Sequence, residues 1–236
     1  MNHLKTSSER KIGKNKLKAK VLIACEDTKS AKIYLQKLAK DCGVLADVIF
    51  AKHIGTDPMS VYTAIAEHIR LNSKIKYESK WIVIDRDSWS LGAFNGAISS
   101  AKSQGIHVAY SNEAYELLLL LHYRRQTASI TRNKLKSELS KKGYLPDYEK
   151  GDELIYEKTI KYQDDAIKNA QELLRRHINN NGIISPDSNN PSTTFHCLVC
   201  YLKNISNKNS LPKVAAECKQ CYSPAVDVNQ CSLIKK

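Results

Sequence analysis

Three acidic side chains stand where short apolar segments of the sequence end. Glu26 directly follows the apolar run 20–25, and Asp85 and Asp87 follow the run 81–84. Two carboxylates at positions i and i+2 of an extended chain point the same way, and a third from a neighbouring strand completes a set of hard oxygen ligands suited to Mg²⁺. Such a site can activate water and neutralise charge on a phosphodiester. The competing interpretation is that these acids are solvated loop residues or helix caps.

The apolar runs alternate with helical patterns along the first half of the chain. Strands are expected at 20–25, 46–51, 81–84 and 106–110, and helices at 28–42, from Asp57-Pro58 onward, and at 91–104. This alternation implies βαβ units, a parallel sheet and helices on both of its faces. Ligands bind at the carboxyl ends of the strands in such sheets, which is where the three acids fall.

The second half of the chain has a helical character. Helices are expected at 113–125, 130–142, 163–180 and 192–202, with irregular, tyrosine-rich sequence at 143–160. The expected organisation is a flexible basic arm at 1–18, an α/β core at 19–125, a helical or irregular insertion at 126–160, C-terminal helices at 161–203 that pack on the core, and a cysteine-containing tail at 204–236.

The charge balance favours a polyanionic partner. The 236 residues include 37 Lys and Arg against 24 Asp and Glu, a formal net charge of +13. Basic surfaces attract nucleic acids by steering and counterion release; the alternative is a surface that only promotes solubility. We find no apolar run long enough to span a bilayer and no secretory signal. We therefore expect a cytoplasmic protein with reduced cysteines that does not bind a membrane.

Two Cys-x-x-Cys pairs raise the question of structural zinc. Cys197 and Cys200 precede Cys218 and Cys221 at a zinc-ribbon spacing. The first pair, however, lies in a stretch with helical periodicity, where cysteines fit an apolar core face. The interpretation as core residues is preferred, and structural Zn²⁺ is the less favoured alternative.

The order of several motifs resembles a known family. The chain reads VLIACEDTKSAKIY, WIVIDRD, SNEAYELLLLLHY, YEK and NPSTTFHCLV across roughly residues 20–202. This series resembles the RloB-like family of small TOPRIM-domain proteins, which occur in bacterial abortive-infection and anti-phage loci. The resemblance implies an α/β fold with a TOPRIM-like parallel sheet flanked by helices and a helical C-terminal part. It also implies that Glu26, Asp85 and Asp87 hold Mg²⁺ or Mn²⁺ as metal-binding and catalytic residues.

The first motif departs from the family pattern. The family usually reads C-E-G followed by a T-E pair, whereas this chain has Asp27 in place of the glycine and Ser30-Ala31 in place of the pair. The loss of the second acid weakens the expectation of strong catalysis. Asp27 could replace the missing carboxylate only if its side chain faces the metal.

The SNEAYELLLLLHY segment supplies a further catalytic candidate. Asn112 and Glu116 share one helix face if the helix begins at Asn112, and the resemblance suggests that this face meets the metal site. Otherwise Asn112 caps the helix and Glu116 complements its dipole. For His122, a structural role is the favoured interpretation.

Basic residues provide candidates for contacts with phosphate. Lys158 is the candidate cation for stabilising the transition state of phosphoryl transfer, because a point-charge donor suits a phosphate; an exposed, functionally neutral lysine is the alternative. The candidates for binding the nucleic-acid backbone are Lys29, Arg86, Arg124 and Arg125.

Two functions from different classes follow. The first is a metal-dependent TOPRIM nuclease effector of an anti-phage system. The resemblance implies that it cleaves RNA such as tRNA and is held in check by an ABC- or AAA-class ATPase encoded alongside. The second is a non-catalytic nucleic-acid-binding or adaptor subunit of the ATPase complex, which the altered first motif favours. The chain has no phosphate-binding glycine loop and so is not itself a P-loop ATPase. A homodimer is left open.

Overall fold

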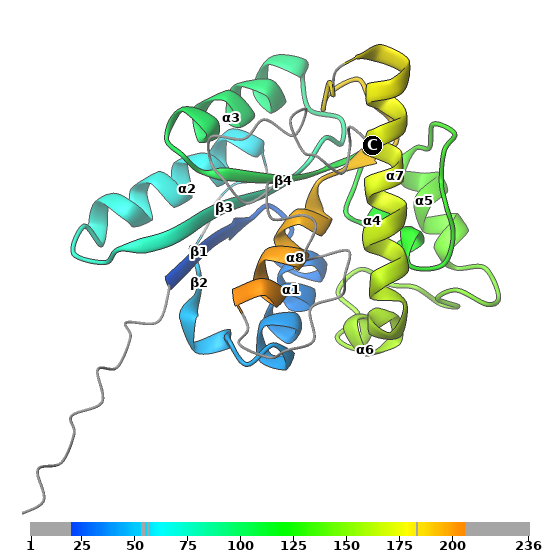
Figure 1. The fold of residues 1–236 in the computed structure, drawn as a ribbon, viewed down its shortest axis with the longest axis horizontal. Coiled ribbons are helices and arrows are strands. Elements are labelled where there is room, and N and C mark those ends of the chain that lie inside the picture. The colour runs from blue at the N-terminus through cyan, green and yellow to red at the C-terminus, as the bar shows by residue number, and fades with distance from the viewer. Residues whose placement is uncertain (1–19, 53–54, 56, 183, 206–236) are drawn as a thin grey trace, which may run out of the picture.

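The structure, a computed structural model, describes residues 20–205 except 53, 54, 56 and 183 (Figure 1). The predicted arm at 1–18 and the tail beyond Ile205 lie outside the described residues. The strands are β1 (Lys20–Cys25), β2 (Val48–Phe50), β3 (Tyr77–Asp85), β4 (His107–Asn112) and β5 (Ser192–Thr193). The helices of the first half are α1 (Ser30–Asp41), η1 (Leu45–Asp47), α2 (Pro58–Leu71) and α3 (Leu91–Ser103).

The strands form one sheet in the order β2-β1-β3-β4-β5. The first four strands are parallel, and β5 pairs antiparallel with β4. In the register, Cys25 lies opposite Val83, and Asp85 lies opposite Ser111. The carboxyl ends of β1, β3 and β4 therefore meet at one edge of the sheet, which we call the acidic edge because Glu26 and Asp85 lie there.

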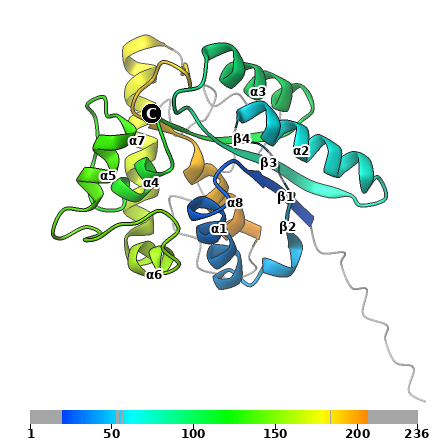
Figure 2. The same ribbon diagram turned by 180° about the vertical axis from the view of Figure 1, so that it is seen from behind.

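Helices cover both faces of the sheet (Figures 1 and 2). Alternate strand residues point to opposite faces: Leu22 and Ile82 pack under α2 and α3, whereas Ile23 and Val83 belong to the larger core with α1 and α8. The central segments of β1 and β3, at 21–25 and 81–84, are apolar throughout because both of their faces are buried. The predicted fold class, an α/β parallel sheet flanked by helices with a helical C-terminal part, is confirmed.

The C-terminal half packs as helices against this sheet. It comprises α4 (Glu116–Leu121), α5 (Arg132–Leu139), α6 (Ile155–Thr159), η2 (Ile160–Tyr162), α7 (Gln163–Asn181) and α8 (Phe195–Ile205). In Figure 1, α7 runs as one long helix beside α4 and α5. None of the helices in the described part of the chain has both the length and the apolar character needed to cross a lipid bilayer.

Element boundaries differ from the predictions around residue 112. The helix predicted at 113–125 is α4 alone, and Asn112 is the last residue of β4. The side chain of Asn112 donates hydrogen bonds to the carbonyls of Pro186 (2.9 Å) and Asp187 (3.2 Å). Neither the shared helix face nor the capping role predicted for Asn112 is therefore correct. The segment at 143–160, predicted to be irregular, contains α6, and β5 occupies the start of the helix predicted at 192–202.

His122 lies in the core, which agrees with the structural role favoured for it. Its Nδ1 donates to the Leu118 carbonyl at 2.9 Å, and its Nε2 accepts from the Tyr34 hydroxyl at 3.3 Å. The Tyr34 hydroxyl in turn accepts from Gln163 Nε2 at 2.9 Å. Burial lowers the pKa of His122 to about 4, so the ring is neutral at physiological pH. The network ties α1, α4 and α7 together.

Candidate functional site

Glu26 reaches from the end of β1 to the end of β3. Its backbone amide donates to the Val83 carbonyl at 2.9 Å and so extends the strand pairing by one residue. Its Oε2 accepts a hydrogen bond from the amide of Asp85 at 3.0 Å, and its Oε1 accepts one from Trp89 Nε1 at 3.1 Å. The structure thus brings Glu26 and Asp85 together and holds the Glu26 carboxyl in one orientation.

Asp85 is buried beside two other acids, with only 7% of its surface exposed. Burial raises its pKa well above the ordinary value, and the charges of Glu26 and Glu116 add to the rise. Burial, supplemented by the charge of Asp87, also raises the pKa of Glu26 to about 7, although the two hydrogen bonds and Arg132 act in the opposite direction. Close carboxylates of this kind favour either a proton or a bound cation.

Asp87 is held by an arginine that the sequence analysis did not single out. Arg132 Nη1 forms a short ion pair with Asp87 Oδ2. The backbone of Asp87 has a positive φ of 39°, and its amide donates to the Glu113 carbonyl at 2.9 Å. Asp87 therefore lies in a turn that runs beside the end of β4, with its carboxylate turned toward α5.

Glu116 lies at the acidic edge because it is the first residue of α4, which begins there. As the first residue of α4 it is 6% exposed, and its Oε1 accepts a hydrogen bond from the Tyr148 hydroxyl at 3.2 Å. Its charge contributes to the raised pKa of Asp85. The structure thus groups Glu116 with Glu26 and Asp85. The helix that carries Glu116 begins at Glu116 itself and not at Asn112.

The side chain of Asp27 accepts hydrogen bonds from backbone amides at the N-terminus of α1. Its Oδ1 accepts hydrogen bonds from the amides of Lys29 (2.8 Å) and Ser30 (2.9 Å), and its Oδ2 lies 3.3 Å from Lys150 Nζ. The carboxylate is therefore committed to backbone amides and a lysine. These contacts argue against Asp27 as a replacement for the missing acid of the first motif.

Three of the predicted cations are engaged in ion pairs. Lys158 Nζ donates to Asp152 Oδ2 at 2.6 Å. Among the described residues, its recorded partner is therefore Asp152 rather than Glu26 or Asp85. Arg124 pairs with Glu138 at 3.2 Å. Arg125 forms two bonds with Glu172, at 2.9 and 3.0 Å. The Lys158 and Arg125 pairs are partly exposed, and ion pairs of this kind contribute little to stability, whereas the carboxyl group of Glu138 is buried.

The two remaining basic candidates behave differently from each other. Arg86 turns back on its own loop, where Nη1 donates to the carbonyls of Asp87 (3.2 Å) and Trp89, and its guanidinium lies 5.8 Å from the centre of the Phe94 ring. It stabilises the turn after β3. Lys29 is exposed just before α1 and remains accessible to a ligand.

The donor set at the acidic edge suits a divalent ion held by few protein ligands. In the described part of the chain, no group of three or more His, Cys, Asp or Glu side chains is arranged to hold a metal ion. Glu26 and Asp85 nevertheless provide two carboxyl groups close enough for their charges to interact, and Mg²⁺ typically uses one or two carboxylates together with water and substrate phosphates. The residues present fit such an ion through Glu26 and Asp85, whereas Asp87 is bound to Arg132.

The first Cys-x-x-Cys pair belongs to the core. Cys197 and Cys200 are 3% and 0% exposed on α8, among the apolar residues of the larger core. Cys218 and Cys221 lie outside the described residues.

Trp89, Arg132 and Tyr148 contact the predicted acids but were missed by the sequence analysis. Trp89 lies only two residues beyond Asp87, and this proximity to the D-x-D pair is a signal that could have indicated it. Arg132 and Tyr148 come from the insertion at 126–160, where nothing in their spacing relates them to the acids.

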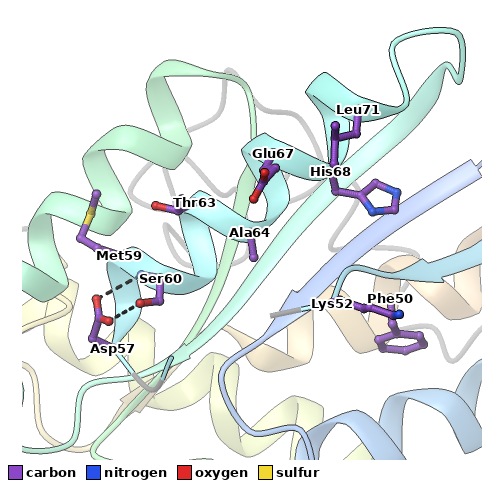
Figure 3. Close-up of a pocket in the computed structure, with 10 residues that line it drawn as sticks. All are labelled: Phe50, Lys52, Asp57, Met59, Ser60, Thr63, Ala64, Glu67, His68 and Leu71. Atoms are coloured by element: carbon purple, nitrogen blue, oxygen red, sulfur yellow. Dashed lines mark hydrogen bonds between the residues drawn. The ribbon is translucent and has the colours of Figure 1, made fainter. Parts of the chain in front are cut away.

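A separate groove of about 720 Å³ lies along α2 and β2 (Figure 3). Its lining includes Phe50, Met59 and Leu71, and Figure 3 shows Asp57 and Ser60 facing each other at one end. Among the described residues that line it, none is a predicted site residue. The groove therefore plays no part in the chemistry proposed for the acidic edge.

The sequence was compared with known protein families, curated proteins and solved structures. No curated protein and no solved structure matches the chain. A family model described as RloB-like protein matches residues 21–202, which is more than three quarters of the sequence and includes all of the acidic edge. The resemblance inferred from the order of the motifs is confirmed: this chain belongs to the RloB-like protein family.

Proposed function

We propose that this chain is a metal-dependent phosphodiesterase of the TOPRIM type that cleaves nucleic acid at the acidic edge. The observation that carries the proposal is the hydrogen-bonded meeting of Glu26 and Asp85 at the ends of β1 and β3, with Glu116 beside them. Perturbed carboxyl groups grouped at the carboxyl edge of a parallel sheet are typical of catalytic sites.

The chemistry follows from the residues at this edge. Glu26 and Asp85 would hold one Mg²⁺ or Mn²⁺ ion, and a bound ion of this kind supplies Lewis acidity toward the phosphodiester and lowers the pKa of water. Trp89 and the amide of Asp85 keep the Glu26 carboxyl oriented, which limits its reorganisation during a reaction. Tyr148 holds Glu116 in the same way.

RNA such as tRNA is the proposed substrate, and an ABC- or AAA-class ATPase encoded alongside is the proposed partner that restrains the activity in anti-phage defence. The support for RNA and for the ATPase is the family resemblance of the motifs. The net charge of +13 supports a nucleic-acid substrate in general.

The test compares acid-to-amide variants of the full chain, assayed on tRNA, single-stranded RNA and duplex DNA with Mg²⁺ or Mn²⁺ and with or without the ATPase. We expect Glu26→Gln and Asp85→Asn to lose activity by about 100-fold or more, since each removes a charged ligand. Glu67→Gln is the matched control, because Glu67 is an exposed acid on α2 whose recorded partner is Arg70. Undiminished cleavage by both site variants would refute the proposal.

A non-catalytic role is the second candidate, and one observation favours it. Asp87, the second acid of the D-x-D pair, is bound to Arg132, and the described residues contain no three-ligand group. A chain with this arrangement can still bind nucleic acid through its basic surface. A wild-type protein that binds RNA but cleaves no substrate under any of these conditions would favour the adaptor.

A further inference from the structure

Arg132 is placed at the acidic edge by its backbone as well as its side chain. It is the first residue of α5, and its amide donates to Glu113 Oε2 at 2.8 Å. Glu113 lies in the loop that follows β4, and its own carbonyl accepts from the amide of Asp87. The N-terminus of α5 and the turn that carries Asp87 are therefore both hydrogen-bonded to Glu113.

The guanidinium of Arg132 lies among several carboxylates yet remains accessible. Its Nη1 contacts Asp87, and the charges of Asp85 and Glu116 also act on it: they raise its pKa although its partial burial acts in the opposite direction. Its side chain is 36% exposed. A guanidinium has five donors in a planar fork, and the recorded bond to Asp87 uses one of its nitrogens, so donors remain for a further anion.

A phosphate that approaches Glu26 and Asp85 meets negative charge and requires a cation beside it. Of the predicted cations, Lys158 and Arg124 are paired with other carboxylates, and Arg86 is turned onto its own loop. Among these four residues, Arg132 is the one whose side chain forms an ion pair with the carboxylate of an acid in the predicted metal set, Asp87.

We propose that Arg132 binds a phosphate of the nucleic-acid substrate and that Asp87 is a positioning residue for Arg132 rather than a metal ligand. A planar guanidinium held at one edge by a carboxylate presents its other donors in the bidentate geometry that suits phosphate. This inference rests on the proposed function in one respect, namely that the substrate is a nucleic acid. In this proposal Asp85 is a metal ligand, whereas Asp87 positions Arg132.

The first test measures binding without cleavage. A labelled single-stranded RNA is titrated with the full-length protein in EDTA at several salt concentrations. Arg132→Gln should weaken binding about tenfold and lower the slope of log K against log salt by about 0.7, the value for one phosphate contact on a single strand. Arg132→Lys keeps the charge and should lose less affinity. Lys134→Gln is the matched control, since it removes the same charge from the exposed face of the same helix and should change affinity less than about twofold. Equal effects of Arg132→Gln and Lys134→Gln would overturn the phosphate role.

The second test separates positioning from metal binding. Asp87→Asn should weaken RNA binding about threefold in the wild-type background and have no further effect in Arg132→Gln, because both changes act through one contact. Removal of a negative charge alone would strengthen RNA binding, so stronger binding by Asp87→Asn would overturn the positioning role. The sign of the change is therefore decisive.

Direct titration with Mn²⁺ completes the comparison. Asp87→Asn should change the Mn²⁺ affinity less than about threefold, whereas Asp85→Asn should lower it at least tenfold. Equal losses in the two variants would identify Asp87 as a metal ligand and overturn the inference. Absence of Mn²⁺ binding by the wild type would instead count against the proposed catalytic function, while the RNA titrations would still decide the role of Arg132. Each variant is also checked for an unchanged unfolding midpoint or, failing that, compared at a temperature where it is fully folded.

Discussion

Glu26 is the residue whose environment has the clearest consequence for the behaviour of the protein. Burial and neighbouring charge raise its pKa to about 7, above the ordinary value of 4.5. Between these two pH values the folded chain binds a proton that the unfolded chain has released. Stability must therefore fall as the pH rises through this window, and Asp85 contributes in the same direction because its pKa is also raised.

The corresponding prediction concerns unfolding at two pH values without divalent ions. Glu26→Gln should be more stable than the wild type by roughly 2 kcal/mol at pH 8. This advantage should shrink severalfold near pH 5, where the folded chain holds the Glu26 proton and the unfolded chain has begun to bind one. Urea unfolding followed by circular dichroism measures the difference. A constant difference at both pH values would show that the Glu26 pKa is not raised. Mg²⁺ should stabilise the wild type more at pH 8 than at pH 5, because protons compete for the same oxygens.

The sequence was sufficient to predict the acidic residues of the site, but not the residues that contact them. Glu26 and Asp85 could be predicted because each follows an apolar strand, and parallel strands end at a common edge. Arg132 and Tyr148 could not, since their positions depend on how the insertion folds back on the edge. The ion pair of Asp87 with Arg132 could not be predicted for the same reason, since the two residues are distant in sequence.

Helix α5 shows how one element is secured next to the site. Glu113 accepts a hydrogen bond from the amide of Arg132 at 2.8 Å and another from Asn190 Nδ2 at 3.3 Å. Asn190 also exchanges two hydrogen bonds with the backbone of Ile130, at 2.9 and 3.1 Å. Residues 113, 130–132 and 190 thus form a clamp that joins three separate parts of the chain.

We expect Glu113→Ala to loosen this clamp. The substitution removes the acceptor of two hydrogen bonds and should cost about 1–3 kcal/mol of stability, with weaker RNA binding because Arg132 loses its position. Glu113→Gln keeps one acceptor oxygen and should cost less in both measurements. Urea unfolding curves with an unchanged slope, together with RNA titrations in EDTA, provide the check. A fully neutral Glu113→Ala variant would contradict the clamp.

Helices and strands were predictable where periodicity is long and local. The alternation of apolar runs gave β1, β3, β4 and the helices between them, because burial on both faces leaves a direct trace in composition. The end of β4 was missed because Ser111 and Asn112 are polar and remain in the sheet through pairing with β5. A two-residue strand that comes some eighty residues later leaves no local pattern.

For the molecule as a whole, the basic charge is the property on which the proposed binding of RNA depends. The basic excess of +13 includes a net +5 from residues 1–19, which hold six Lys or Arg residues and one Glu. Association with RNA should therefore depend strongly on salt, since phosphate contacts release counterions.

The prediction is a comparison of full-length chains. Replacement of the basic residues Lys5, Arg10, Lys11, Lys14, Lys16 and Lys18 by Gln should weaken RNA binding and lower the slope of log K against log salt by up to about 4, at roughly 0.7 per phosphate contact on a single strand. Binding isotherms from low to physiological salt give the slope. An unchanged slope would place the phosphate contacts elsewhere on the molecule.

The position of β5 also has a consequence for how the protein is made. This strand completes the sheet beside β4, and α8 directly after it covers the face on which α1 lies. A ribosome must therefore release almost all of the described chain before that face can close. Until then the apolar residues of α1 and β4 that α8 covers lack this partner, and exposed apolar surface of this kind makes a nascent chain prone to aggregation.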